Sequence, residues 1–276
     1  MDERAKRRRA RKRAKQQRAA FVFSLLLVTI VLTCVYIIYR VLGGPGSIPW
    51  TSALEPNPYT PADFAVRNGY VTCTAVPTRR GIDVSEHQNE IDWEQVRDAG
   101  FDFAFIRFGY RGYSIGRIHA DERARENLAN AKAAGLDVGV YFYAQAVNVQ
   151  EAAEEAAWCL EFLQGEKLDL PVVYDWEWAG SDKRTGSMDR ETVTACFQTF
   201  CTAIEEGGYQ AMIYFNNHVA RDLLDLEALA QYPFWLAQYR DQMDFPHRVA
   251  LWQYTETGSV PGIQGDVDID LMFLYR

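Results

Sequence analysis

The chain has 276 residues, of which 48% are hydrophobic and 24% are charged, and its net charge is −8. This is a globular composition, with room for one large core or two small ones. The first 20 residues contain ten Lys or Arg and two acidic residues, a net charge of +8, so the rest of the chain carries −16. The asymmetry excludes a uniformly acidic protein and separates a basic tail from an acidic remainder.

An uncharged apolar run follows the basic tail. Residues 1–18 cannot bury a core and are expected to be disordered. A basic run of this kind can bind nucleic acid, but no charge interrupts the sequence from Ala19 to Tyr39. About 20 apolar residues cross the hydrocarbon core as a helix. We therefore expect a transmembrane anchor over 19–42 rather than a nucleic-acid partner. The positive-inside rule puts the tail in the cytoplasm and the remainder outside the cell.

A cleaved signal peptide is the alternative for this run. The run is long for a signal peptide, and no A-x-A site follows it. The stretch 31–34 faintly resembles a lipoprotein processing box, but apolar residues continue beyond Cys34. An uncleaved anchor is the favoured interpretation.

Residues 43–78 contain six of the ten prolines, which predicts a semi-rigid, partly extended linker. Within it, residues 61–66 are expected to form a short turn that docks on the following domain. Four cysteines lie beyond the anchor and allow three disulfide connectivities; buried free thiols are the alternative: Cys73, Cys159, Cys196 and Cys201. No Cys or His cluster indicates a metal, and no cofactor is expected.

From Arg80 onward, strands and helices alternate. The expected strands are 81–85, 101–108, 138–144, 172–178, 210–215, 234–239, 249–254 and 267–273, and the expected helices are 92–99, 120–134, 150–163, 188–206 and 218–230. Such alternation predicts a parallel sheet with crossover helices, and eight strands suggest closure into a barrel. The fold class is therefore α/β: an irregular TIM-like barrel of eight strands and about five helices over 79–276, preceded by the single transmembrane helix.

Two acids stand at the end of the fourth predicted strand. Side chains alternate along a strand, so Asp175 and Glu177 share one face. Neighbouring like charges raise at least one pKa, which keeps one carboxyl protonated beside an ionised one. A solvated strand end is the alternative. Chemistry in such barrels occurs at the carboxyl ends of strands, where Asp83 of the first strand and Asp268 of the last would join them. Asp266 and Asp270 compete with Asp268 for this role.

Aromatic residues also gather near strand ends. Each is more often part of a core than a ligand contact, but together with acids they suit a sugar, whose C–H faces stack on rings. They are Tyr141, Tyr143, Tyr214, Trp235, Tyr239, Trp252 and Tyr254.

Several blocks, in order, resemble the family 25 glycoside hydrolases, which are lysozymes (N-acetylmuramidases) that cut bacterial peptidoglycan. The blocks are RGIDVSEHQ at 80–88, IDW at 91–93, FIR at 105–107, GVYFY at 139–143, DWE at 175–177, LWQY at 251–254 and VDID at 267–270. A lone D-x-E would be a weak signal, and the specificity lies in the whole set. The resemblance covers about residues 80–276 and implies an irregular eight-stranded barrel.

The resemblance also implies roles. Glu177 would be the general acid on the glycosidic oxygen, and Asp175 would orient or polarise the N-acetyl group of the muramic acid sugar. Asp83 would assist from the opposite wall, and Asp268 would complete an acidic ring. The family usually has Asn or a similar residue where Asp270 stands. Whether the reaction retains or inverts the anomeric configuration stays open. The expected substrate contacts are Asp268, Tyr141, Tyr143, Tyr214, Trp235, Trp252 and Gln253.

The predicted function is that of a monomeric, membrane-anchored muramidase. It would hydrolyse the β-1,4 bond between N-acetylmuramic acid and N-acetylglucosamine in peptidoglycan, for cell-wall remodelling or catabolism. Its partners would be glycan strands and, through the N-terminal helix, the cell membrane. A non-catalytic peptidoglycan-binding barrel and a chitinase-like glycosidase are the alternatives. Three acids kept together argue against a pure binder, because binding needs no acid with a tuned pKa.

Overall fold

The computed structural model describes residues 54–275. The predicted basic tail (1–18), the predicted anchor (19–42) and the first part of the predicted linker (43–53) lie outside these residues. Across 54–275, no helix combines the length and the apolar character that crossing a membrane requires.

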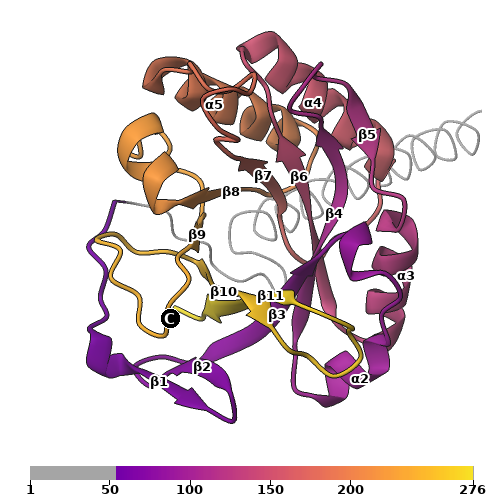
Figure 1. Cartoon of the computed structure of the whole chain (residues 1–276), viewed down its shortest axis with the longest axis vertical. Coiled ribbons are helices and arrows are strands. Elements are labelled where there is room, and N and C mark those ends of the chain that lie inside the picture. Colours follow the sequence, from indigo (N-terminus) through magenta and orange to yellow (C-terminus); the bar gives the residue numbers. More distant parts are fainter. Residues whose placement is uncertain (1–53, 276) are drawn as a thin grey trace, which may run out of the picture. The chain divides into compact units, whose positions relative to one another are not determined.

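Eight strands close into a barrel, with helices on its outside (Figure 1). Their spatial order is β3-β11-β10-β9-β8-β7-β6-β4, and the pairing of β3 with β4 closes the ring. This confirms the predicted eight-stranded α/β barrel. The strands are β3 (Thr78–Val84), β4 (Phe103–Arg111), β6 (Asp137–Ala144), β7 (Val172–Trp176), β8 (Ala211–Asn216), β9 (Phe234–Ala237), β10 (Leu251–Gly258) and β11 (Val267–Phe273).

The last strand runs against the others. β11 pairs antiparallel with both β10 and β3, whereas the remaining barrel pairs are parallel. The expectation of an all-parallel sheet is therefore wrong for this strand. A parallel neighbour needs a crossover of about a dozen residues or more, and the loop between Gly258 and Val267 is shorter. As a result, the start of β11, not its end, lies beside the carboxyl ends of the other strands.

Four α-helices flank the described barrel: α2 (Trp93–Asp98), α3 (Ala124–Ala134), α4 (Val149–Leu163) and α5 (Arg190–Glu206). The fifth predicted helix, 218–230, is reduced to a π-helical turn, η3 (Val219–Leu223). The Asp225 carboxylate accepts the backbone N–H groups of Glu227 and Ala228. Such local hydrogen bonds compete with helix continuation.

The predicted helix 120–134 begins later than expected. A short strand, β5 (Ile118–Ala120), precedes it and pairs antiparallel with the end of β4. The turn between these strands contains Gly116 at a φ of 68°, a conformation that glycine adopts at little cost. The β4–β5 hairpin therefore takes Ala120 from the predicted helix, and residues 121–123 form a turn before α3 begins at Ala124.

Residues 54–78 are folded onto the barrel rather than extended throughout. They form a 3-10 turn, η1 (Pro61–Asp63), and a hairpin of β1 (Phe64–Arg67) and β2 (Tyr70–Cys73). Asn68 and Gly69 make the hairpin turn with φ values of 53° and 83°, as expected for Asn-Gly. Phe64 and Val71 are buried in the core. The folded domain therefore begins before residue 79, and 54–78 is not a free linker.

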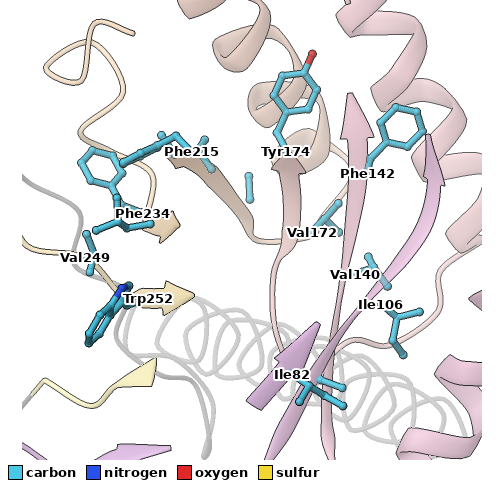
Figure 2. Packing of buried hydrophobic residues seen from close by; sticks show 14 of the residues in the cluster. Ile82, Ile106, Val140, Phe142, Val172, Tyr174, Phe215, Phe234, Val249 and Trp252 are labelled. Carbon is cyan, nitrogen blue, oxygen red and sulfur yellow. The ribbon is translucent and has the colours of Figure 1, made fainter. Parts of the chain in front are cut away.

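The strands separate two layers of packed side chains. Outward-facing residues, among them Ile82, Val140, Val172 and Tyr174, belong to the large cluster shown in Figure 2. Tyr174 stacks on Phe200 of α5 with ring centroids 4.3 Å apart. The same alternation that turns Val172 and Tyr174 outward turns Asp175 inward.

Large rings fill the barrel interior below the acids. Phe105 lies with its centroid 4.7 Å from that of Trp235, and both are buried. The rings press on glycine backbones: a Cβ on Gly81 would lie 2.1 Å from the Phe103 ring, and one on Gly139 would lie 2.3 Å from the Phe105 ring. Glycine is favoured at these two positions because the rings would have to shift to make room for a Cβ.

The cysteines Cys73, Cys159, Cys196 and Cys201 are all free thiols. Of the two alternatives left by the sequence, the structure therefore shows unpaired cysteines. Burial raises the pKa of the Cys159 and Cys201 thiols well above the usual value, so both stay protonated and unreactive.

Candidate active site

A cavity of about 240 Å³ opens at the carboxyl ends of the parallel strands. All site residues predicted from the sequence line it, with the exception of Trp252. The lining residues are Asp83, Arg107, Tyr141, Tyr143, Asp175, Glu177, Tyr214, Trp235, Tyr239, Gln253, Glu256 and Asp268.

Trp252 lies on the other side of the barrel wall, and its expected role as a substrate contact is corrected. Its side chain is fully buried, its Nε1 donates to the Gln238 carbonyl oxygen at 2.9 Å, and its ring packs on Phe64 at 5.2 Å. Gln253, the next residue along β10, faces the cavity. Strand alternation allows only one of these two neighbours to point inward.

The paired acids sit where β7 ends. Asp175 is the penultimate residue of the strand and is 5% exposed, whereas Glu177 follows the strand and is partly exposed. Their carboxyls hydrogen-bond to each other. Burial raises the pKa of both, and for Asp175 the charge of Glu177 adds to this effect. Two carboxyls in such contact share a proton, because both cannot ionise freely at short range.

A buried glutamine holds the Glu177 main chain in place. Gln145 Nε2 donates to the Glu177 carbonyl oxygen at 2.7 Å, and Thr185 Oγ1 donates to Gln145 Oε1 at 3.3 Å. Gln145 is fully buried at the end of β6. The residue after β7 is thus fixed from the neighbouring strand, although it is outside regular structure itself.

Gln253 connects both walls of the cavity. Its Oε1 accepts the hydroxyls of Tyr214 at 2.9 Å and Tyr239 at 3.2 Å. Its Nε2 donates to Asp83 Oδ2 at 2.7 Å. With all three hydrogen bonds made, the amide has a single favourable orientation, and Asp83 is positioned across the barrel from Asp175.

The last strand contributes two acids at different depths. Asp268 pairs in register with Asp83 and lines the cavity. Asp270 lies two residues further along β11, deeper in the barrel, and pairs with Gly81. Asp270 is fully buried, accepts Trp235 Nε1–H at 2.9 Å and contacts the Asp83 carboxyl. Burial raises the pKa of both Asp83 and Asp270. Asp266 lies in the exposed loop before β11, so Asp268 is the acid of this strand that reaches the cavity.

Burial, together with the charges of Glu256 and Glu177, raises the pKa of Asp268 to about 7. Glu256 is exposed on the rim, and its charge also raises the pKa of Glu177. The Glu256 carboxylate therefore raises the pKa of both Glu177 and Asp268, although it is itself exposed.

Two lining residues, Arg107 and Glu256, were not predicted from the sequence. Arg107 Nε donates to Asp121 Oδ2 at 2.9 Å, and its Nη2 donates to Glu86 Oε1 at 3.3 Å. The sequence pattern could have indicated Arg107, because it lies two residues after Phe105 on β4 and strand alternation puts both side chains on the inner face. Glu256 follows an irregularity in the β10–β11 register after Gln253, and a bulge gives no reliable sequence signal.

The arrangement favours acid chemistry on an uncharged substrate that becomes cationic. Its one lining cation, Arg107, is already paired with two carboxylates, so the cavity is anionic. A shared proton can leave through Glu177, and the remaining negative charges stabilise a positive charge that develops nearby. Among residues 54–275, no group of three or more His, Cys, Asp or Glu is arranged to hold a metal ion.

Replacing Glu256 by glutamine should move the alkaline limb of the pH–activity profile to lower pH. The change removes a charge that raises the pKa of Glu177 and Asp268, so a proton donor in this cluster deprotonates at lower pH. The shift should shrink at high salt because Glu256 is exposed. Initial rates between pH 4 and 9, at low and high salt, measure it, with Glu256→Asp as the charge-preserving control. A limb that stays in place, or moves upward, contradicts this electrostatic role.

Comparison with known proteins agrees with this geometry. Residues 82–263 match the sequence profile of glycosyl hydrolases family 25. The chain is 24% identical over 192 residues to the autolytic lysozyme of Clostridium acetobutylicum, covering 69% of this chain and 55% of that protein. It is 28% identical over 211 residues to lysozyme M1 of Streptomyces globisporus, covering 68% of this chain and 66% of that one.

A solved structure shares the fold. The modular autolysin LytC of Streptococcus pneumoniae, solved in complex with a synthetic peptidoglycan ligand, superposes with a TM-score of 0.64 at 24% identity, over 76% of this chain and 52% of that one. The chain thus spans about half the length of this structure and of the clostridial relative. The profile match covers most of the barrel, including the β7 acids, and on this ground the chain belongs to glycosyl hydrolase family 25.

Proposed function

We propose that this protein is a muramidase that hydrolyses the β-1,4 bond between N-acetylmuramic acid and N-acetylglucosamine in peptidoglycan. The observation that carries the proposal is the hydrogen-bonded pair of Asp175 and Glu177 at the end of β7, inside an anionic cavity lined by tyrosines. Lysozyme relatives and the family membership support it.

Glu177 is the proton donor to the glycosidic oxygen in this proposal. It is the more exposed member of the pair, so a sugar in the cavity reaches it first. Burial raises its pKa, which favours the protonated form that a general acid needs near neutral pH.

Asp175 acts on the sugar's N-acetyl group. Apart from the Glu177 carboxyl, nothing in residues 54–275 hydrogen-bonds to its buried Oδ1. An oxygen that receives no N–H from the protein can accept the N–H of an acetamido group when a sugar binds. Asp83 and Asp268, on adjoining strands, add negative charge around the oxocarbenium-like transition state.

Replacing Asp83 or Asp175 by asparagine should lower kcat more than it raises KM. Their charges matter most where the substrate is cationic, which is the transition state rather than the ground state. Steady-state kinetics on soluble glycan strands separate the two parameters. A rise in KM with kcat unchanged in both variants contradicts the assignment.

Digestion of purified peptidoglycan by the full chain tests the reaction. Mass spectrometry should find N-acetylmuramic acid at the new reducing ends. N-acetylglucosamine there would indicate cleavage of the other glycosidic bond. Binding without any new reducing end would indicate a non-catalytic barrel, and cleavage of chitin oligosaccharides alone would indicate a chitinase-like enzyme.

We further propose that the enzyme is anchored in the cell membrane with its barrel facing the cell wall, where it remodels or degrades peptidoglycan. The support is the sequence alone: the basic residues 1–18 followed by the uncharged run from Ala19 to Tyr39. Basic residues favour the cytoplasmic side of such a run.

Protease added to cells stripped of their wall should release a soluble, active fragment. Its new N-terminus should fall within residues 43–53, ahead of the residues that the structure describes, which begin at Leu54. Full-length protein should be found in the membrane fraction before treatment. Spontaneous appearance in the medium, already cut after the apolar run, would show a signal peptide instead.

A further inference from the structure

A second cavity, of about 530 Å³, adjoins the catalytic one. It lies between the β1–β2 hairpin and the carboxyl-terminal part of β10, and Tyr239 lines both cavities. We call it the hairpin groove. Tyr239 is 49% exposed and binds Gln253 through its hydroxyl, so one face of the groove is fixed to the catalytic hydrogen-bond network. A ligand that leaves the catalytic cavity across Tyr239 enters the groove directly.

The hairpin forms a rigid wall. Phe64 packs edge-on against Trp252 at 5.2 Å. Tyr70 lies 4.2 Å under the Arg80 guanidinium and donates its hydroxyl to the Ser259 carbonyl oxygen at 3.3 Å. These contacts attach both hairpin strands to the barrel, so the wall is formed before a ligand arrives. Pre-organisation of this kind lowers the entropy cost of binding. The family profile begins at residue 82, so the wall is built by residues that precede the matched region.

The lining of the groove suits an uncharged, hydroxylated ligand. Val66 and Tyr239 present exposed apolar surface, and Thr255 and Thr257 present hydroxyls from β10. The Tyr254 hydroxyl is buried, lies near the Val71 backbone N–H and donates to no acceptor in the described chain. Ring faces and neutral hydrogen-bonding groups are the combination that sugars use.

Charged ligands fit the groove less well. Its one cation, Arg240, is paired with Asp244, and Asp241 adds a negative charge. The carboxylates of a peptide stem would therefore find no free cation there. Where stem peptides are attached, the lactyl carboxyl of each N-acetylmuramic acid is in an amide bond, so the glycan backbone itself carries no charge. It is also the part of the polymer that continues from the cleavage site.

We propose that the hairpin groove binds the continuation of the glycan strand beyond the sugars held in the catalytic cavity. The proposal rests on the muramidase function above and makes the enzyme selective for long strands over short oligosaccharides. Binding energy from sugars far from the reacting bond then contributes to catalysis on long strands only.

The test compares two substrates, long glycan strands and a tetrasaccharide of the same repeat, both with their lactyl carboxyls amidated, with the full chain in detergent. Val66→Trp should fill the groove without disturbing the fold, because Val66 is 51% exposed. It should lower kcat/KM on long strands about tenfold, equivalent to 1.4 kcal/mol of binding, and leave the tetrasaccharide unaffected. Arg67→Trp is the matched control, since Arg67 is the exposed neighbour on the same strand and does not line the groove. It should change neither rate.

Thr257→Trp, on the opposite wall, should repeat the result if Val66→Trp folds poorly. Equal losses on the two substrates, or no loss on long strands in either variant, overturn the proposal. If the wild-type chain cuts neither substrate, the muramidase proposal fails, and binding of long strands to the uncleaving chain tests the groove by itself. A tenfold weaker affinity in Val66→Trp then supports a glycan site, and equal affinity refutes it.

Discussion

Glu177→Gln should lower kcat on peptidoglycan by about 10²–10⁴-fold, the usual contribution of a general acid. Glutamine has nearly the same shape but cannot deliver a proton at neutral pH. The Gln145 hydrogen bond to the Glu177 main chain does not involve the replaced carboxyl, so the loop should keep its position. The release of reducing ends, measured at the optimum pH of the wild type, gives the rate.

Glu161→Gln is the control for this change, because Glu161 is an exposed glutamate on α4, away from the cavity. It should keep full activity, and both variants should unfold at the wild-type temperature. Turnover by Glu177→Gln close to the wild-type rate would remove Glu177 from the role of proton donor.

Phe105→Ala should cost about 3–5 kcal/mol of unfolding free energy, the range for a large buried aromatic. The ring is fully buried in the barrel interior and contacts the rings of Trp235 and Phe103, so its removal leaves a cavity. Urea unfolding followed by tryptophan fluorescence measures the loss. Phe162→Ala on α4 is the control and should cost less, because Phe162 is only partly buried.

Gly139→Ala tests whether the interior is packed as closely as the rings indicate. A Cβ there would lie 2.3 Å from the Phe105 ring, so the substitution should cost about 1–3 kcal/mol by overpacking. In the Phe105→Ala background the clash with the ring is absent and a 2.9 Å approach to Leu170 Cβ remains, so the double variant should lose clearly less than the sum of the two single losses. Additive losses would show that the two residues do not press on each other.

The strand pattern alone predicts much of the site. Alternation puts Asp175 on the inner face of β7, and the count of eight strands brings Asp83 and Asp268 to the same mouth. The direction of β11 is not visible in its own residues, because a strand carries the same alternation whichever way it runs. Only the short loop before it, between Gly258 and Val267, distinguishes the antiparallel arrangement.

The remaining differences have local causes. Trp252 was expected to meet the substrate because aromatic rings suit sugars, but periodicity cannot decide whether Trp252 or Gln253 faces inward. The sequence pattern does not indicate that Glu256 lines the cavity, because the β10–β11 register shifts after Gln253. The β1–β2 hairpin lies in a proline-rich stretch whose composition resembles that of a linker, and its fold depends on burial of Phe64 and Val71 against distant strands. Tertiary contacts of this kind leave little trace in a local pattern.

Closure of the barrel, and with it the cavity, depends on the antiparallel strand β11. It separates β3 from β10 and carries Asp268 and Asp270. Asp83 and its partner Gln253 are 170 positions apart in the chain. Asp83 of β3 therefore reaches its final position only after β10 and β11 have joined the barrel. Until β11 pairs with them, β3 and β10 each have an open edge, and open edges are prone to aggregation. A chain in which β11 has not paired therefore lacks a complete cavity.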